Sequence, residues 1–198
     1  MSKNFAPLTS HPFKSGSRFA TPTQIMPQNI TLDDPAVNVM TDLRSVAVIS
    51  ARAKTSLDKA NAKMIRYGVR TLLVLDDEDK VTGVLTATDV LGEKPVRFLQ
   101  QMGGTHADIL VRDVMTVQRE LEVLKLEDVL KAKVGNILAT LKAAGRQHAM
   151  VVEENADGSQ TVRGLFSATQ VARQLGVQPK TAEVSKVLAE IEAAVSAH

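Results

Sequence analysis

Two hydroxyls and a carboxylate directly follow an apolar run in the stretch GVLTATDVLG, residues 83–92. Thr86, Thr88 and Asp89 stand where a strand would end and a helix would begin. The first turn of a helix exposes unpaired N–H groups and the positive end of the helix dipole, so it can hold a phosphate. A carboxylate beside it can accept two hydrogen bonds from the neighbouring hydroxyls of a ribose. The stretch therefore has the groups needed to bind a nucleotide.

The same spacing also has a purely structural interpretation. Thr86 and Asp89 match a capping box, in which each side chain accepts a hydrogen bond from the other residue's backbone N–H. The stretch FSATQVARQLG, residues 166–176, repeats the pattern with Ser167, Thr169 and Gln170. Glutamine can cap a helix, but it lacks the charge that strengthens bonds to a ribose diol. The residues leave both interpretations open at Asp89 and favour a cap at Gln170.

Both stretches belong to a repeat that covers most of the chain from Val37 onward. Three pairs of anchors recur in the same order: Met40 with Met115, Gly68 with Gly145, and Gly83 with Gly164. The distance between partners grows only where a turn has lengthened, as a duplicated unit with variable loops would show. Each copy reads as strand, helix, strand, strand, helix.

Each copy contains one stripe of apolar residues at helical spacing. We expect Thr55 to begin the first of these helices, and Gly68 and Gly145 to end the two. Polar turns, DDEDK in the first copy and EENADGSQ in the second, separate the paired strands. The stripes are Leu57, Ala60, Met64 and Ile65 in the first copy, and Val134, Ile137, Leu138 and Leu141 in the second.

Three segments lie outside the two copies. Residues 1–32 have no lasting period and are expected to form a flexible arm. Residues 98–108 contain Gly103 and Gly104 and read as a linker. Residues 178–198 predict an amphipathic C-terminal helix that covers the module or joins two chains; its stripe is Val184, Val187, Leu188, Ile191 and Val195.

Composition excludes several classes of function. The chain has no cysteine, so disulfides and thiolate chemistry are impossible, and its four histidines lack metal-ligand spacing. Basic and acidic residues, 24 and 22, are interleaved and aromatic residues are few, which argues against a nucleic-acid partner. No apolar run predicts a membrane span or an export signal, so we expect a cytoplasmic protein. Nothing groups a nucleophile with its base, so we expect no enzyme and no required cofactor.

The repeated pattern resembles the CBS domain pair, or Bateman module, over residues 33–177. The motif Gly-x-x-Ser/Thr-x-Ser/Thr-Asp is matched in full at Gly83, Thr86, Thr88 and Asp89, and each copy is preceded by Val-Met-Thr. The resemblance implies an α+β fold of tandem CBS domains, each β-α-β-β-α, packed about a pseudo-twofold axis. It divides the chain into residues 33–97 and 109–177.

The resemblance also implies a ligand and a site. CBS pairs commonly bind AMP, ADP, ATP or S-adenosylmethionine between their domains, and the hydroxyls face the phosphate while the acid takes the ribose. The implied ligand-binding residues are Asp89, Thr86, Thr88, Arg70, Thr71, Gly83, Ser167, Thr169, Gln147 and His148.

Two of these residues also have simpler explanations. Arg70 at a strand start can be merely solvated, and His148 can be a hydrogen-bonded residue at a domain seam. At the second site, Gln170 departs from the motif.

We therefore expect a stand-alone regulatory module that senses an adenosine-containing ligand, for example to report energy state. It would signal by domain reorientation to a protein target or to a second chain in a homodimer. The alternative is a ligand-free interaction or oligomerisation scaffold, with the motif residues serving as caps.

Overall fold

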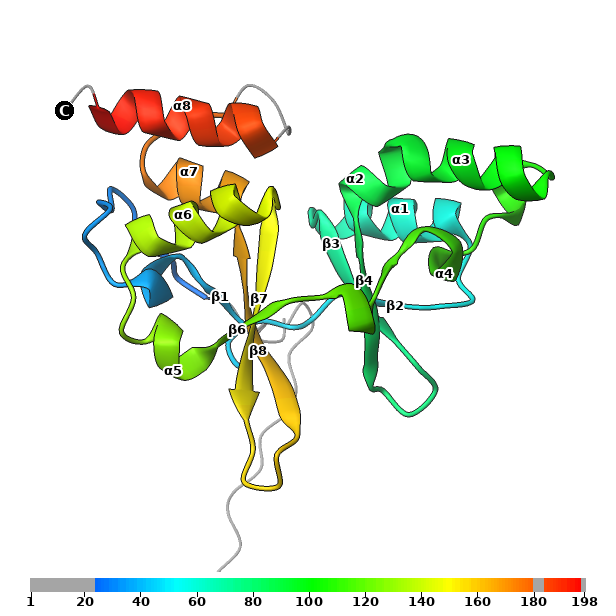
Figure 1. The fold of residues 1–198 in the computed structure, drawn as a ribbon, viewed down its shortest axis with the longest axis horizontal. Coiled ribbons are helices and arrows are strands. Elements are labelled where there is room, and N and C mark those ends of the chain that lie inside the picture. The colour runs from blue at the N-terminus through cyan, green and yellow to red at the C-terminus, as the bar shows by residue number, and fades with distance from the viewer. Residues whose placement is uncertain (1–23, 180–183, 197–198) are drawn as a thin grey trace, which may run out of the picture.

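The structure, a computed structural model, describes residues 24–179 and 184–196. It consists of two lobes, each built on a four-stranded sheet with helices packed against it (Figure 1). The strand orders are β2-β3-β4-β5 in the first lobe and β1-β8-β7-β6 in the second. This is the α+β architecture that the sequence predicts.

The first lobe follows the predicted order of strand, helix, strand, strand and helix. Strand β2 pairs parallel to β3, and β3 pairs antiparallel to β4. Its elements are β2 (Ser50–Arg52), α1 (Leu57–Tyr67), β3 (Thr71–Leu75), β4 (Val81–Thr86) and α2 (Ala87–Leu91), followed by α3 (Glu93–Met102), the 3-10 helix η2 (His106–Asp108) and α4 (Val111–Val114).

The second lobe repeats this order with one added helical turn, α5, after its first strand. Strands β6 and β7 are parallel, and β7 and β8 are antiparallel. Its elements are the 3-10 helix η3 (Gln118–Glu120), β6 (Val123–Lys125), α5 (Leu126–Val129), α6 (Val134–Ala144), β7 (His148–Glu154), β8 (Gln160–Ser167), α7 (Ala168–Gln174) and α8 (Val184–Ser196).

The predicted helix ends are confirmed, whereas one predicted start and one predicted core residue are wrong. Gly68 and Gly145 end α1 and α6 with φ of 64° and 60°, in the left-handed region that glycine adopts without strain. Helix α1 begins after Ser56, while the Thr55 hydroxyl accepts from Arg52 N–H within the preceding turn. Ile65 is 74% exposed, because it lies beside the buried stripe of α1 and not within it.

The two sheets exchange strands. Strand β1 (Thr41–Asp42), after the 3-10 helix η1 (Ala36–Val39), pairs with β8 in the second lobe, and β5 (Thr116–Val117) pairs with β4 in the first. Figure 1 shows β1 on the same side of the molecule as β7 and β8. We keep residues 33–97 and 109–177 as the proposed division, but each stretch contributes a strand to the other's sheet.

In each exchanged segment, a methionine packs against a glycine in the sheet that receives the segment. A Cβ on Gly164 would lie 2.5 Å from Met40 Sδ, and a Cβ on Gly83 would lie 3.1 Å from Met115 Sδ and 2.6 Å from the Thr116 carbonyl oxygen. Two glycines of the repeat are thus needed for close approach of another segment.

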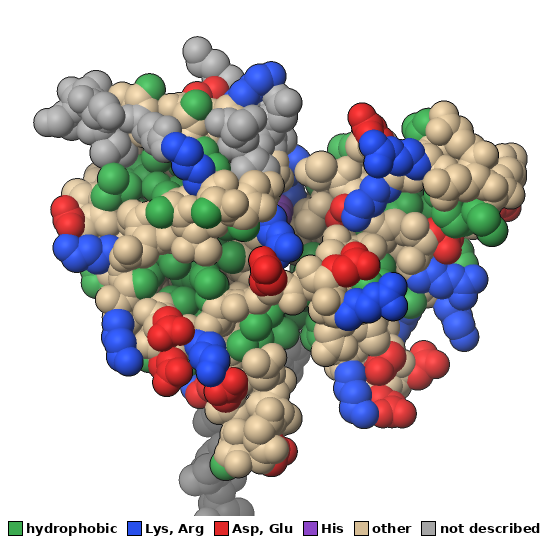
Figure 2. Space-filling model, viewed as in Figure 1, with side chains coloured by type: hydrophobic (Ala, Val, Ile, Leu, Met, Phe, Trp, Pro, Cys, Tyr) green, Lys and Arg blue, Asp and Glu red, His purple; other side chains and the backbone are tan. Residues whose placement is uncertain are grey.

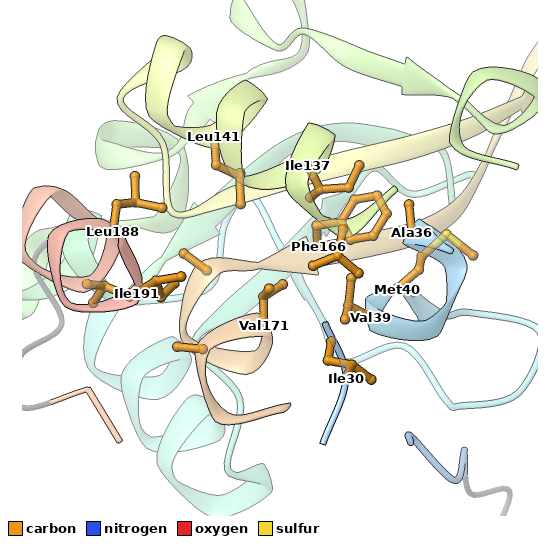
Figure 3. Packing of buried hydrophobic residues seen from close by; sticks show 14 of the residues in the cluster. Ile30, Ala36, Val39, Met40, Ile137, Leu141, Phe166, Val171, Leu188 and Ile191 are labelled. Atoms are coloured by element: carbon orange, nitrogen blue, oxygen red, sulfur yellow. The ribbon is translucent and has the colours of Figure 1, made fainter. Parts of the chain in front are cut away.

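The larger core lies in the second lobe and includes residues from both ends of the described chain. Figure 3 shows Ile30, Val39 and Met40 from the N-terminal segment close to Phe166 and Val171. The C-terminal helix α8 closes the opposite side of this core with three buried side chains, Val187, Leu188 and Ile191. These three confirm the predicted stripe, while the side chains of Val184 and Val195 lie outside the described residues.

A small apolar cluster joins the two sheets at the seam. Its buried members are Leu73, Val84 and Met150, two from the first sheet and one from the second. Because both lobes contribute, a change in their relative placement would disturb this cluster. Most of the predicted flexible arm lies outside the described residues; within 24–32, Ile30 is buried and Gln24 is hydrogen-bonded to the backbone of residues 40 and 42.

Candidate functional site

The junction between β4 and α2 forms a complete capping box. Thr86 N–H donates to Asp89 Oδ2 at 2.8 Å, and Asp89 N–H donates to Thr86 Oγ1 at 3.2 Å. The Thr86 hydroxyl also donates to Asp89 Oδ2 at 2.7 Å. The structural interpretation of this spacing is therefore correct, and Asp89 Oδ2 is fully occupied by local contacts.

The other carboxylate oxygen of Asp89 faces a lysine that the sequence analysis did not single out. Lys94 Nζ lies 2.6 Å from Asp89 Oδ1, and the same ammonium donates to the Val114 carbonyl at 3.0 Å. The Asp89 side chain is 10% exposed. A carboxylate oxygen can accept two hydrogen bonds, so Oδ1 keeps acceptor capacity beyond Lys94.

Asp89 borders a cavity of about 270 Å³ between the two lobes. Figure 2 shows the surface hollowed between the lobes, with charged side chains of both signs around the hollow. Residues of both repeats line the cavity, so a molecule held there would touch both lobes. The lining is Thr71, Val84, Thr86, Thr88, Asp89, Thr116, Leu121, Glu122, Gly145, Arg146, Gln147, His148, Met150 and Leu165.

One hydroxyl in this lining is buried without a partner. Thr71 Oγ1 makes no hydrogen bond within the part of the chain that the structure describes. Leaving a buried hydroxyl unpaired costs about 1–3 kcal/mol. Thr71 is one of the residues that line the cavity, so its unpaired hydroxyl is a candidate contact for a bound molecule.

Thr71 and His148 occupy equivalent places, each at the first residue of a strand that faces the strand-to-helix junction. Thr71 lies opposite Thr86 in the first sheet, and His148 lies opposite Ser167 in the second. Burial and then the positive charge of Arg70 lower the pKa of His148 to about 4, against a smaller opposing effect of Asp89. The imidazole is therefore neutral at neutral pH and can both donate and accept a hydrogen bond.

The structure brings six of the ten predicted site residues into one cavity and leaves four outside its lining. The six are Thr71, Thr86, Thr88, Asp89, Gln147 and His148. Arg70 is exposed and acts on the cavity through its charge on His148, and Gly83 packs against Thr116 and Met115. Ser167 and Thr169 stand at the equivalent junction of the second lobe.

That second junction differs from the first, and the expected cap at Gln170 is wrong. Ser167 precedes α7 without a side-chain hydrogen bond to the helix, among the residues described. Gln170 Nε2 instead lies 3.5 Å from Met26 Sδ and 3.4 Å from Gln174 Oε1. The Gln170 side chain is long enough to reach Met26 in the neighbouring N-terminal segment. An aspartate at this position would be shorter and would have no N–H group to donate.

Sequence reasoning missed the apolar wall and the charged rim of the cavity. Val84, Met150 and Leu165 lie on strands whose alternation predicts a buried face, but alternation does not reveal that another sheet meets that face. Arg146 and Glu122 form an exposed pair at 3.4 Å on the rim. Gln147 is the counterpart of Arg70 in the repeat, and Arg146 directly precedes it. A basic residue at that place is the signal that could have identified Arg146.

Neither a metal centre nor a membrane span is found in the described ranges. Residues 24–179 and 184–196 contain no cluster of three or more His, Asp or Glu side chains suited to a metal ion. Their helices are all too short or too polar to cross a bilayer.

Comparison with known proteins identifies the first repeat. Residues 37–95 match the model of the CBS domain family. No curated protein matches the chain.

Solved structures extend the likeness to both repeats. An uncharacterized protein from Pyrococcus horikoshii is 21% identical with a TM-score of 0.53, covering 77% of this chain and 100% of that one. A CBS domain protein of unknown function from Thermoplasma acidophilum is 17% identical with a TM-score of 0.50, covering 77% of each chain. The protein CBSX2 from Arabidopsis thaliana, in complex with AMP, is 23% identical with a TM-score of 0.49, covering 71% of this chain and 94% of that one.

Proposed function

The protein contains a CBS domain in its first half and has the fold of a CBS-domain pair, and from this premise we propose that it is a regulatory module for an adenosine-containing ligand. The ligand class is AMP, ADP, ATP or S-adenosylmethionine, and the proposed site is the cavity beside Asp89. The proposal assigns no catalytic step to the chain.

The observation that carries the proposal is the buried, unpaired hydroxyl of Thr71, a residue that lines that cavity. It lies opposite the junction that carries Thr86 and Asp89, and it has no partner among the described residues. A ligand hydroxyl or ring nitrogen would satisfy it and recover the free energy lost by burying it.

The rest of the lining fits the parts of a nucleotide. Val84, Met150 and Leu165 offer an apolar wall to a flat base, as is usual in small-molecule pockets. The remaining acceptor capacity of Asp89 Oδ1 suits a ribose hydroxyl. Arg146, whose exposed pairing with Glu122 is weak, can turn to a phosphate at the rim.

Regulation would follow from the two-sided lining. A ligand that contacts Asp89 from one lobe and His148 from the other favours the arrangement in which both are in reach. We propose that a protein partner, or a second chain of a homodimer, responds to that arrangement. The proposal includes a cytoplasmic setting, where the ligand would report energy state.

Calorimetric titration of the full chain with AMP, ADP, ATP and S-adenosylmethionine tests the proposal. We expect at least one to bind, and Asp89→Asn to weaken it by about 1–3 kcal/mol, because the amide loses the charge-assisted bonds. Melting the variant without ligand measures separately what the lost ion pair with Lys94 costs. Absence of heat and of any rise in Tm with all four at millimolar concentration would contradict the proposal.

The second candidate is a ligand-free scaffold, and one observation favours it. Both carboxylate oxygens of Asp89 already have partners in Thr86 and Lys94. If the scaffold is correct, Asp89→Asn changes stability alone, and none of the four compounds protects the protein against thermal unfolding.

A further inference from the structure

We infer that residues 24–30 form a built-in strap over the strand-to-helix junction of the second lobe, so that each chain offers one ligand site and not two. The ligand in this inference rests on the proposed function, whereas the strap itself rests on contacts in the structure.

The strap is fixed at its first residue by a side-chain amide that bonds to backbone groups as a neighbouring strand would. Gln24 Nε2 donates to the Met40 carbonyl at 2.9 Å, and Gln24 Oε1 accepts from Asp42 N–H at 2.7 Å. Strand β1 is the edge strand of its sheet, with β8 on one side. The Gln24 amide thus supplies one donor and one acceptor to backbone groups at that edge.

The strap is fixed at its other end by a buried glutamine of α7. Gln174 is fully buried, and its Nε2 donates to the Pro27 carbonyl and to the Asn38 carbonyl, both at 2.9 Å. Ile30 N–H donates in turn to the backbone carbonyl oxygen of Gln174 at 3.2 Å. A buried amide is stable only with its N–H groups paired, so the Gln174 side chain needs the strap in place.

Between these anchors the strap reaches the residue that replaces the motif acid. Gln170 Nε2 lies 3.5 Å from Met26 Sδ, one turn of helix before Gln174. Ile30 adds its side chain to the core of the second lobe, where Figure 3 shows it near Val39. Polar and apolar contacts therefore hold the strap at residues 24, 26, 27 and 30, while Ile25 between them is exposed.

The chemistry explains why amides stand at these positions. A carboxylate at position 174 would face two carbonyl oxygens and repel them, whereas an amide donates to both. The counterpart of Gln174 in the first lobe is Glu93, which is exposed and pairs with Arg97. The second lobe thus has amides, Gln170 and Gln174, where the first has acids. The amides bind residues 24–30 at the second junction, whereas Asp89 at the first junction borders the cavity.

Hydrogen exchange of the full chain, followed by mass spectrometry, tests the strap without any ligand. Gln174→Leu nearly keeps the side-chain volume but cannot donate. We therefore expect the Ile30 amide, which donates to the backbone carbonyl of residue 174, to exchange at least about tenfold faster in the peptide covering residues 24–30. Gln160→Leu, at an exposed site on β8, is the matched control and should leave this peptide unchanged. Gln24→Ala is the milder second variant if Gln174→Leu does not fold, and it should also raise exchange.

Equal exchange of this peptide in the wild type and in Gln24→Ala would overturn the strap, whether or not a nucleotide binds. Calorimetry with AMP then counts sites: one per chain agrees with the inference, and two equivalent sites overturn it. If AMP and the other three compounds give no heat while residues 24–30 are protected, the proposed function fails and the strap remains.

Discussion

Lys94 Nζ lies 2.6 Å from Asp89 Oδ1 and 3.0 Å from the carbonyl oxygen of Val114. One ammonium group therefore connects the motif acid to the segment that crosses into the second lobe. A ligand that bonds to Asp89 Oδ1 must share this oxygen with the ammonium of Lys94 or displace that ammonium. Thr116, two residues beyond Val114, also lines the cavity. The charge at position 94 should consequently select among ligands.

We predict that Lys94→Gln changes the preference between anionic and cationic ligands. The amide can still donate to Val114, but a positive charge near the cavity is lost. Affinity for AMP should fall and affinity for S-adenosylmethionine, a sulfonium cation, should rise, each by about 1 kcal/mol or fivefold. Calorimetry measures both, with Lys80→Gln as a control on an exposed turn. A change of the same sign for both ligands would argue against this role.

Thr71→Val should separate stability from binding. The substitution removes an unpaired buried hydroxyl at nearly constant shape, so the free energy of unfolding without ligand should stay the same or rise by about 1 kcal/mol. Binding of AMP should weaken, because the ligand loses that partner.

Thr82→Val is the matched control for Thr71→Val. The Thr82 hydroxyl donates to the Val74 carbonyl at 3.2 Å, so its loss should lower stability and leave AMP binding unchanged. Urea unfolding and calorimetry of both variants give the comparison. A Thr71→Val protein that is less stable and binds AMP normally would refute the assignment.

His148 should make the protein less stable in mild acid. Its pKa is about 4 in the folded protein and 6.5 in an unfolded chain. Between these values the unfolded state binds more protons, so the free energy of unfolding falls as the pH falls from 6.5 toward 4. The effect is about 1.6 kcal/mol between pH 6.5 and 5.

Urea unfolding at a series of pH values measures this slope, and His148→Gln should remove the part due to the imidazole. Other groups titrate in both proteins alike, so the difference between the two curves is the quantity to compare. Identical slopes would mean that His148 ionises freely in the folded protein.

Gly83→Ala should destabilise the fold by about 1–3 kcal/mol through overpacking. The added Cβ would lie 2.6 Å from the backbone oxygen of Thr116, which cannot move without shifting the exchanged strand β5. Gly135→Ala in α6 meets its nearest atom at 3.4 Å and should be neutral or stabilising. Thermal unfolding of both variants checks this, and similar Tm values for the two would contradict the close approach.

The repeat could be recognised from the sequence because its signals are local. The helix ends at Gly68 and Gly145 each depend on the conformation of one residue. The paired strands are indicated by the polar turns that lie between them in the sequence. The capping box at Asp89 is also local, since its partners are three residues apart.

The strand exchange could not be predicted, because it depends on pairing between distant residues. Nothing in the neighbourhood of Met40 indicates that it packs on Gly164, and the same holds for Met115 and Gly83. The contact between Gln170 and Met26 is equally non-local, so the local spacing by itself predicts a cap there. The apolar wall of the cavity depends on how the two sheets meet, which no single strand specifies.

The most direct test of the central claim is a crystal structure of the full chain grown with AMP. We predict the nucleotide in the cavity between the lobes, with a ribose hydroxyl on Asp89 Oδ1 and a ligand atom within hydrogen-bond distance of Thr71 Oγ1. AMP bound elsewhere, or a cavity without AMP at a concentration that saturates binding in solution, would contradict the claim.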